Sequence, residues 1–401
     1  MKLLTQKMMW LGMALVLIVL ILFGSATMGS VLGSEPKEIP VALVVLDQPT
    51  ELPSGETLEV GKAIQTTLGS NPALPFVWHV VGSEEEAREG LDKREYYGAL
   101  VLPANLSSGL LSLATSSPIH PHVKIIANEG MSTQASTIVT TALGQALRMI
   151  GEELSQQLLE QIGKQKGQIP VEAAKALVTP MSVQEEVIHS PGVNNALGNA
   201  PALLTQVMWI GSLVTGIFLF LASKKAIAAG SRGWAVSTVQ ATVGLVIVSL
   251  ASGFTLWMAL SWYGMQMADA GGTWLFLCLV GSTFFLLQSS LLNWIGFRAM
   301  PLLVFLMFFS IPLLNTAPEF LPQTTRDWIY SWTPLRFAAE GLREVMYFGG
   351  LDAVSSNAFI LWGVAGGFLV LLLASGFKAN RAKDAAPASV TGDQIMDGLE
   401  Q

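Results

Sequence analysis

The sequence is poor in cysteine and in charged residues. Cys278 is the only cysteine among 401 residues, so the chain cannot form an internal disulfide. Charged residues make up 13% of the chain, against about 25% in an ordinary soluble protein. Residues 203–297 contain only four of them: Lys224, Lys225, Arg232 and Asp269. This stretch is too apolar for a globular core and predicts helices embedded in lipid.

Catalytic and metal-binding motifs are also missing from the sequence. The string nearest to a phosphate-binding loop, GETLEVGKA at residues 55–63, has one residue too many, and Ala63 replaces the magnesium-binding Ser or Thr. The serine hydrolase and zinc protease signatures are absent, and no Cys/His cluster has the spacing of metal ligands. These absences predict that the chain is not an enzyme and holds no cofactor. The net charge of −7, with no basic stripe, also argues against a nucleic-acid partner.

Long hydrophobic runs are what the sequence does contain, and their order indicates the architecture. The first run, residues 8–30, is long enough to cross a bilayer, since a helix needs roughly 20 apolar residues to do so. A mostly polar region, residues 31–201, follows. Five further runs then predict spans at 202–223, 236–260, 273–296, 299–316 and 357–377. The expected fold class is therefore an α-helical polytopic membrane protein with six spans in a 1+5 arrangement.

The first run has two interpretations. Its basic start and the small residues Gly24, Ser25 and Ala26 are compatible with a cleaved signal peptide. However, the apolar core of a signal peptide is usually about 7–15 residues long, and this run is longer. The sequence favours an uncleaved anchor.

Residues 31–201 are expected to form a mixed α/β domain. Short β-rich runs predict strands at 41–46, 76–81, 97–102 and 123–127, and a helix is expected at 58–68. Ser83 followed by Glu86 is a capping box, which predicts that a second helix begins there. Gly98 at the start of the third strand suggests that another part of the backbone approaches closely.

A long helix is predicted at 132–164, where apolar residues recur every three or four positions. Two interpretations remain open for its apolar face: it packs on its own domain, or it forms a stalk or dimer seam. Residues 166–201, rich in proline and glycine, are interpreted as a connector that returns to the membrane.

The distribution of basic residues predicts the orientation of the spans. Basic residues of segment 1–7 and of the loop between the second and third spans fall on one side of a six-span chain, together with Arg298, Lys378, Arg381 and Lys383. The loop at 263–272 on the other side carries Asp269 and no Lys or Arg. The positive-inside rule therefore places both termini in the cytoplasm and the 31–201 domain outside, in the plasma membrane.

Two segments near the end depart from a simple span. The run at 299–316 is short and contains Pro301 and Pro312, so it is either a kinked span or a broken helix that dips and returns. Residues 318–356 are too polar to span and are expected to form amphipathic helices at the outer membrane interface. Polar side chains within the spans, such as Gln240, Gln288 and Asn293, are interpreted mainly as contacts between helices.

Several strings together resemble the permease subunits of type-2 ABC exporters, and within them the phage-infection-protein (YhgE/Pip-like) branch. The strings are IPVALVVLD at 39–47, SEEEA at 83–87, EYYGALVLP at 95–103, NEG at 128–130 and WTPLRFAAEGLR at 332–343. The resemblance implies an exporter permease that moves a small molecule, lipid-like or polymeric cargo outward. It also implies a separate ATPase subunit and a homodimer.

The resemblance also implies two candidate sites. A helix carrying Pro334, Arg336, Glu340 and Arg343 would stand at the outer end of the transport path, with the three charged residues spaced to meet on one face. The alternative for this helix is an interfacial anchor stabilised by its own ion pairs. A candidate coupling loop toward the ATPase contains Lys224, Lys225 and Arg232. The alternative for the whole protein is a non-transporting surface scaffold or receptor, such as a secretion accessory or a phage-attachment factor.

Overall fold

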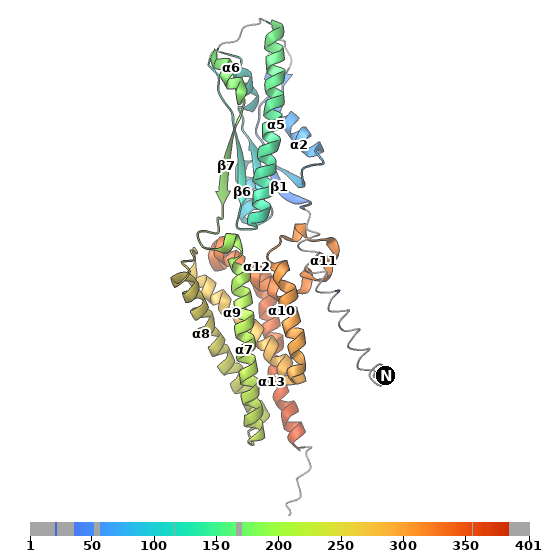
Figure 1. Cartoon of the computed structure of the whole chain (residues 1–401), viewed down its shortest axis with the longest axis vertical. Coiled ribbons are helices and arrows are strands. Elements are labelled where there is room, and N and C mark those ends of the chain that lie inside the picture. Colours follow the sequence, from blue (N-terminus) through green and yellow to red (C-terminus); the bar gives the residue numbers. More distant parts are fainter. Residues whose placement is uncertain are drawn as a thin grey trace, which may run out of the picture.

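The computed structural model describes residues 21, 36–51, 57–115, 117–165, 171–354 and 356–384. The predicted first span at 8–30, apart from Ile21, and most of the predicted tail at 378–401 lie outside these residues. The described chain is elongated, with a β-sheet region at one end of its long axis and a helical bundle at the other (Figure 1).

Five strands form one mixed sheet in the order β4-β1-β5-β6-β7. Strand β1 pairs in parallel with both β4 and β5, β5 pairs antiparallel with β6, and β6 pairs in parallel with β7. Two short strands, β2 and β3, form a separate ribbon. The bounds are β1 Ile39–Val45, β2 Thr50–Glu51, β3 Thr57–Leu58, β4 Phe76–Val81, β5 Gly98–Leu102, β6 His122–Asn128 and β7 Ser182–Ile188. This sheet with its helices confirms the predicted mixed α/β region.

Helices cover both faces of the sheet because the strand side chains alternate in direction. Ile39, Val41 and Leu43 of β1 point into a core shared with several helices, whereas Ala42 and Val44 point to the opposite face. The first face is covered by α2 (Val60–Ser70), α4 (Leu106–Ser112), α5 (Thr133–Gln165) and α6 (Val171–Val178), and the second by α3 (Glu84–Asp92). The first half of α5 therefore packs on its own sheet. This is the interpretation in which the apolar face of the helix packs on its own domain.

The start of α3 shows the predicted capping box. The Ser83 hydroxyl accepts a hydrogen bond from the Glu86 amide at 3.1 Å. The Glu86 carboxylate in turn accepts from the Gly82 amide at 2.7 Å, one residue earlier than the usual partner. Gly98 also behaves as expected, since a Cβ there would lie 2.7 Å from the carbonyl oxygen of Ile126.

The interpretation of residues 166–201 as a plain connector was wrong. The described part of this segment contains α6 (Val171–Val178) and the edge strand β7. Strand β7 reads as polar because it is only half covered: Gln184 and Glu185 are exposed, and Glu186 is half-buried. Arg88 on α3 pairs with Glu186 at 2.6 Å and so ties the edge strand to the sheet region.

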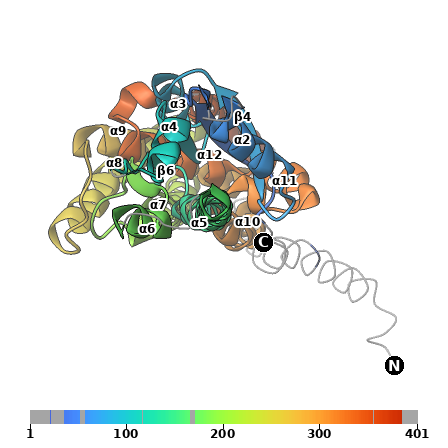
Figure 2. The same cartoon turned by 90° about the horizontal axis from the view of Figure 1, so that it is seen from above.

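Long apolar helices build the bundle. They are α7 (Ala200–Ala228), α8 (Gly233–Ser261), α9 (Ala270–Ile295), α10 (Met300–Leu314) and α13 (Ser356–Asp384), with the 3-10 turn η2 (Gly296–Ala299) between α9 and α10. Shorter elements lie between the sheet region and these helices: η1 (Ala196–Gly198), η3 (Pro318–Phe320), α11 (Gln323–Trp328), η4 (Tyr330–Trp332), α12 (Pro334–Tyr347) and η5 (Gly350–Ala353). Figure 2 shows α11 and α12 lying beneath the sheet region when the molecule is viewed along its axis.

Four stretches of the described chain are long and apolar enough to cross a membrane: Ala200–Ala228, Gly233–Ser261, Ala270–Leu314 and Ser356–Lys378. The third joins α9 and α10 through Gly296, whose backbone is left-handed. Helix α10 has 15 residues, which gives about 22 Å at 1.5 Å per residue, less than the roughly 30 Å of a bilayer core. The helical membrane architecture is confirmed, and the count of six spans stays a prediction.

Polar side chains inside the bundle join helices to one another. The Gln288 amide donates to the carbonyl oxygen of Trp209 at 3.2 Å, which links α9 to α7. The Asn293 amide donates to Gln240 and to Ser375, both at 3.0 Å, which links α9 to α8 and α13. These contacts agree with the interpretation of these residues as helix–helix contacts.

Candidate functional site

Helix α12 lies between the bundle and the sheet region. Its sequence places apolar residues on the side that packs on the bundle and charged residues on the side that contacts the sheet region. Leu335, Ala338, Leu342 and Val345 are fully buried in the core of the bundle. Spacing of three and four residues puts them on one side of the helix and leaves the charged residues for the other. We call residues 318–347, which comprise η3, α11, η4 and α12, the junction segment. It is the candidate site because both halves of the molecule meet on it.

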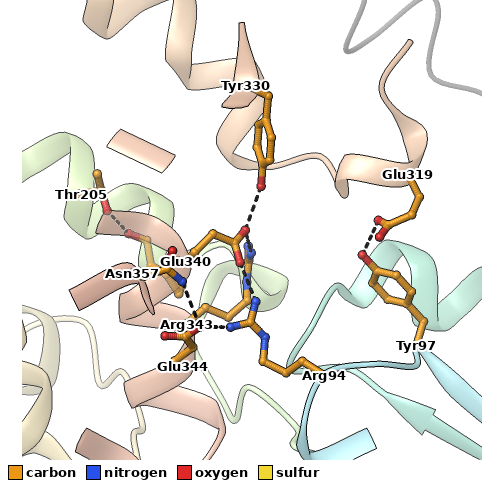
Figure 3. A network of polar contacts seen from close by, with 10 residues as sticks. Arg94, Tyr97, Thr205, Glu319, Tyr330, Glu340, Arg343, Glu344 and Asn357 are labelled. Atoms are coloured by element: carbon orange, nitrogen blue, oxygen red, sulfur yellow. Dashed lines mark hydrogen bonds and ion pairs between the residues drawn. The ribbon is translucent and has the colours of Figure 1, made fainter. Parts of the chain in front are cut away.

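Arg94 reaches from the sheet region to α12. It follows α3 with a left-handed backbone (φ 64°), and its guanidinium pairs with Glu340 at 2.9 Å and with Glu344 (Figure 3). The Glu344 side chain is only 2% exposed and accepts a second hydrogen bond, from Asn357 on α13, at 3.0 Å. Arg94 therefore supplies the cation that a buried carboxylate needs.

Glu340 is the centre of the same network. It accepts hydrogen bonds from the Tyr330 hydroxyl at 3.1 Å and from Arg343 at 3.0 Å, in addition to its pair with Arg94. Burial opposes ionisation of this carboxyl, but the charges of Arg343 and Arg94 and the Tyr330 hydrogen bond outweigh it and hold its pKa below the usual range. Glu340 is therefore ionised at neutral pH.

A second contact joins the sheet to the start of the junction segment. The Tyr97 hydroxyl, at the entry to β5, donates a hydrogen bond to the Glu319 carboxylate (Figure 3). Burial, followed by the charge of Glu319, raises the pKa of Tyr97, so the phenol stays neutral and can donate. Next to it, Ala317 and Phe320 are buried in the core of the sheet region rather than that of the bundle. Phe320 is 2% exposed.

A third contact lies at the end of α12. The Phe348 ring packs against His189, with ring centroids 4.4 Å apart, and lies 5.8 Å from the Arg94 guanidinium carbon. His189 follows β7 and pairs with Asp92 at 3.2 Å. Apolar and ionic contacts thus attach the junction segment to the sheet region, and the aromatic contact of Phe348 follows directly after it.

A cavity of about 660 Å³ opens between the two halves beside this network. Its walls come from the start of α5, the loop before α7, η3 and α12. Charged side chains of both signs line it: Arg94, Glu319, Arg336, Glu340 and Arg343. The cavity is therefore lined by charges of both signs, and two of them, Arg94 and Glu340, pair across the junction.

The predicted site residues fall into two separate places. Pro334 starts α12, and Arg343 and Glu340 meet on one face as their spacing predicted. Arg336 is on the same helix, where its guanidinium stacks over the Tyr330 ring at 4.3 Å. Lys224, Lys225 and Arg232 lie at the opposite end of the bundle, beside the loop at 229–232. The sequence analysis missed the partners from the sheet region, Arg94 and Tyr97, because nothing in a single sequence indicates which distant charges will meet.

These features define a class: a polytopic helical membrane protein whose spans carry a mixed α/β region, joined through an ion-paired amphipathic helix. The sequence matches the family described as ABC-2 family transporter protein over residues 7–374, and the chain belongs to this family. No curated protein and no solved structure gives a significant match. Members of the family are permeases, typically non-catalytic membrane subunits that pair with a nucleotide-binding ATPase.

The lowered pKa of Glu340 predicts a loss of stability in acid. A carboxyl with a depressed folded pKa contributes stability above its unfolded pKa, and this contribution is lost as the pH falls through the folded value. The unfolded reference is 4.5, so the loss is expected below about pH 4.5. The check is thermal unfolding in detergent between neutral pH and pH 3, for the wild type and Glu340→Gln. The difference in midpoint should be largest near neutral pH and shrink in acid. A difference independent of pH would contradict this role of the charge.

Proposed function

We propose that this chain is the permease subunit of a type-2 ABC exporter from the phage-infection-protein (YhgE/Pip-like) branch. It would act as a homodimer with a separate ATPase and move a small molecule, lipid-like or polymeric cargo outward. In this proposal the chain has six spans in the plasma membrane, with both termini in the cytoplasm and the sheet region outside. The family match and the basic residues at the end of the bundle far from the sheet support it.

The observation that carries the proposed mechanism is the attachment of α12 to both halves of the molecule. Its apolar face is part of the bundle core, and its charged face is ion-paired to Arg94 of the sheet region. A shift of the spans would therefore move α12, and the sheet region would move with it. Transport requires a path that opens when a partner biases two conformations. We infer that the junction segment is the outer gate, with the 660 Å³ cavity as the space through which cargo leaves.

The end of the bundle far from the sheet region is the proposed contact surface for the ATPase, through which ATP-driven movement would be transmitted. Lys224 and Lys225 are exposed in the last turns of α7, and Arg232 immediately precedes α8. Exposed cations on a short loop suit a contact with acidic side chains of a partner. Exchanging the signs, as in Lys225→Glu with Arg232→Glu, is expected to weaken recovery of the ATPase without altering the junction segment.

The shortness of the loop at 229–232 favours the alternative of a non-transporting scaffold or receptor, since it leaves little surface for a motor protein. Affinity purification of the full chain in mild detergent, with partners identified by mass spectrometry, separates the two proposals. The permease proposal predicts a nucleotide-binding subunit that is depleted by the Lys225→Glu/Arg232→Glu variant. Absence of such a subunit, together with normal surface function of residues 31–201 fused to an unrelated anchor, would support the scaffold.

A further inference from the structure

We propose that a second cavity, at the end of the bundle far from the sheet region, binds the anionic headgroup of a phospholipid. The cavity has a volume of about 260 Å³ and lies where α7, α8, α9 and α13 meet. It is lined by Phe220, Ser223, Lys224, Ile227, Gln240 and Asn293, among others. This inference does not depend on export, because it concerns only how this end of the chain meets the membrane.

Fixed polar groups form the floor of the cavity. Gln240 is 2% exposed, and its side-chain oxygen accepts hydrogen bonds from Asn293 at 3.0 Å and from Ser223 at 3.1 Å. The second contact of Asn293, with Ser375, holds its amide in place. Phe220, Ile227 and Val236 supply apolar walls beside this floor. Apolar walls next to a preorganised polar floor suit the region of a lipid where the headgroup meets the acyl chains.

Lys224 supplies a positive charge at this cavity. The Lys224 ammonium lies 4.8 Å from the centre of the Phe220 ring, and Lys224 lines the cavity. Neither residues 200–268 nor residues 270–318, which include α7 to α10, contain an Asp or Glu. A cation held on an aromatic ring beside hydroxyl and amide groups attracts an anion such as a phosphate diester.

Tryptophans place the cavity at the depth of lipid headgroups. Trp234, one residue after the cavity residue Gly233, is 48% exposed, and Trp294, next to Asn293, is 37% exposed. The Lys378 ammonium donates to the Trp294 carbonyl at 3.0 Å and lies 5.1 Å from its ring. Exposed tryptophans on a membrane helix favour the interface between the acyl chains and water. The ligand that fits this depth is therefore a lipid from the adjoining leaflet.

Native mass spectrometry of the full chain tests this assignment. The protein, purified in a neutral detergent, is mixed with phosphatidylglycerol or with phosphatidylcholine of identical acyl chains, and the bound fraction is measured. The wild type is expected to retain phosphatidylglycerol preferentially. Lys224→Gln should weaken that retention about fivefold, the usual contribution of one basic residue at a membrane surface. Lys225→Gln is the matched control, because this neighbour is exposed and does not line the cavity.

A second variant separates the cavity from general surface charge. Ser223→Phe would fill the cavity without removing a cation and is also expected to abolish the preference for phosphatidylglycerol. Equal loss in Lys224→Gln and Lys225→Gln, or full retention in Ser223→Phe, would overturn the proposal in favour of a diffuse basic surface. Displacement of the lipid by soluble glycerol 3-phosphate at similar concentration would overturn the assignment to a lipid.

Discussion

Arg94→Ala is expected to release the sheet region from α12 while the bundle stays folded. The substitution removes the Arg94 guanidinium from the Glu344 carboxylate, whose side chain is 2% exposed. Removing one partner of a buried ion pair costs roughly 3–5 kcal/mol. Hydrogen exchange measured by mass spectrometry should therefore show loss of protection by a factor of roughly a hundred or more in residues 318–347. Protection within α8 and α9 should be unchanged.

Two further variants show whether loss of the Arg94–Glu344 ion pair causes the loss of protection. Lys93→Ala changes the neighbouring residue, which is 63% exposed and pairs with the equally exposed Glu89, and it should have almost no effect. Adding Glu344→Gln to Arg94→Ala should restore part of the protection, because a neutral amide no longer leaves a charge buried. Protection that falls further in the double variant would contradict the ionic explanation.

Phe320→Ala is expected to weaken the attachment of the junction segment to the sheet region, because it removes an apolar contact between them. Phe320 belongs to the junction segment, yet it is buried in the core of the sheet region. Truncation of a buried Phe to Ala typically costs about 3–5 kcal/mol through lost burial and the cavity left behind. The thermal unfolding midpoint of the protein in detergent should fall, and the sheet region should become sensitive to protease at residues 189–199.

The matched control for Phe320→Ala is Trp328→Ala on α11. Trp328 is a larger aromatic residue of the same junction segment, but it is 79% exposed. Its truncation should leave the midpoint and the protease pattern close to those of the wild type. If both variants behaved alike, Phe320 would be acting as a surface residue rather than as part of the sheet core.

Local patterns in the sequence were sufficient for most of the secondary structure. The apolar runs at 41–46 and 76–81 predicted β1 and β4, and the capping box at Ser83 predicted the start of α3. The long apolar runs gave α7, α8, α9 and α13 because lipid demands continuous hydrophobic length. Strand β7 was missed because an edge strand with consecutive polar residues at 184–186 lacks the apolar alternation on which such predictions depend.

The site was only half predictable for a physical reason. Contacts within one helix, such as Arg343 with Glu340, follow from spacing and were predicted. Contacts between distant parts, such as Arg94 with Glu344 and Tyr97 with Glu319, depend on how two domains dock. Phe320 was interpretable only as part of an interfacial segment, since its sequence neighbours do not indicate that it enters another domain's core.

The central claim is that the sheet region and the junction segment move as one body when the bundle changes conformation. Spin-label distances in the complex with its ATPase, with and without nucleotide, test it most directly. Cys278→Ser provides the background, with labels on exposed positions: Glu89→Cys paired with Trp328→Cys, and Glu89→Cys paired with Trp262→Cys at the end of α8. The account predicts that nucleotide leaves the first distance unchanged and shifts the second. A first distance that changes as much as the second would contradict it.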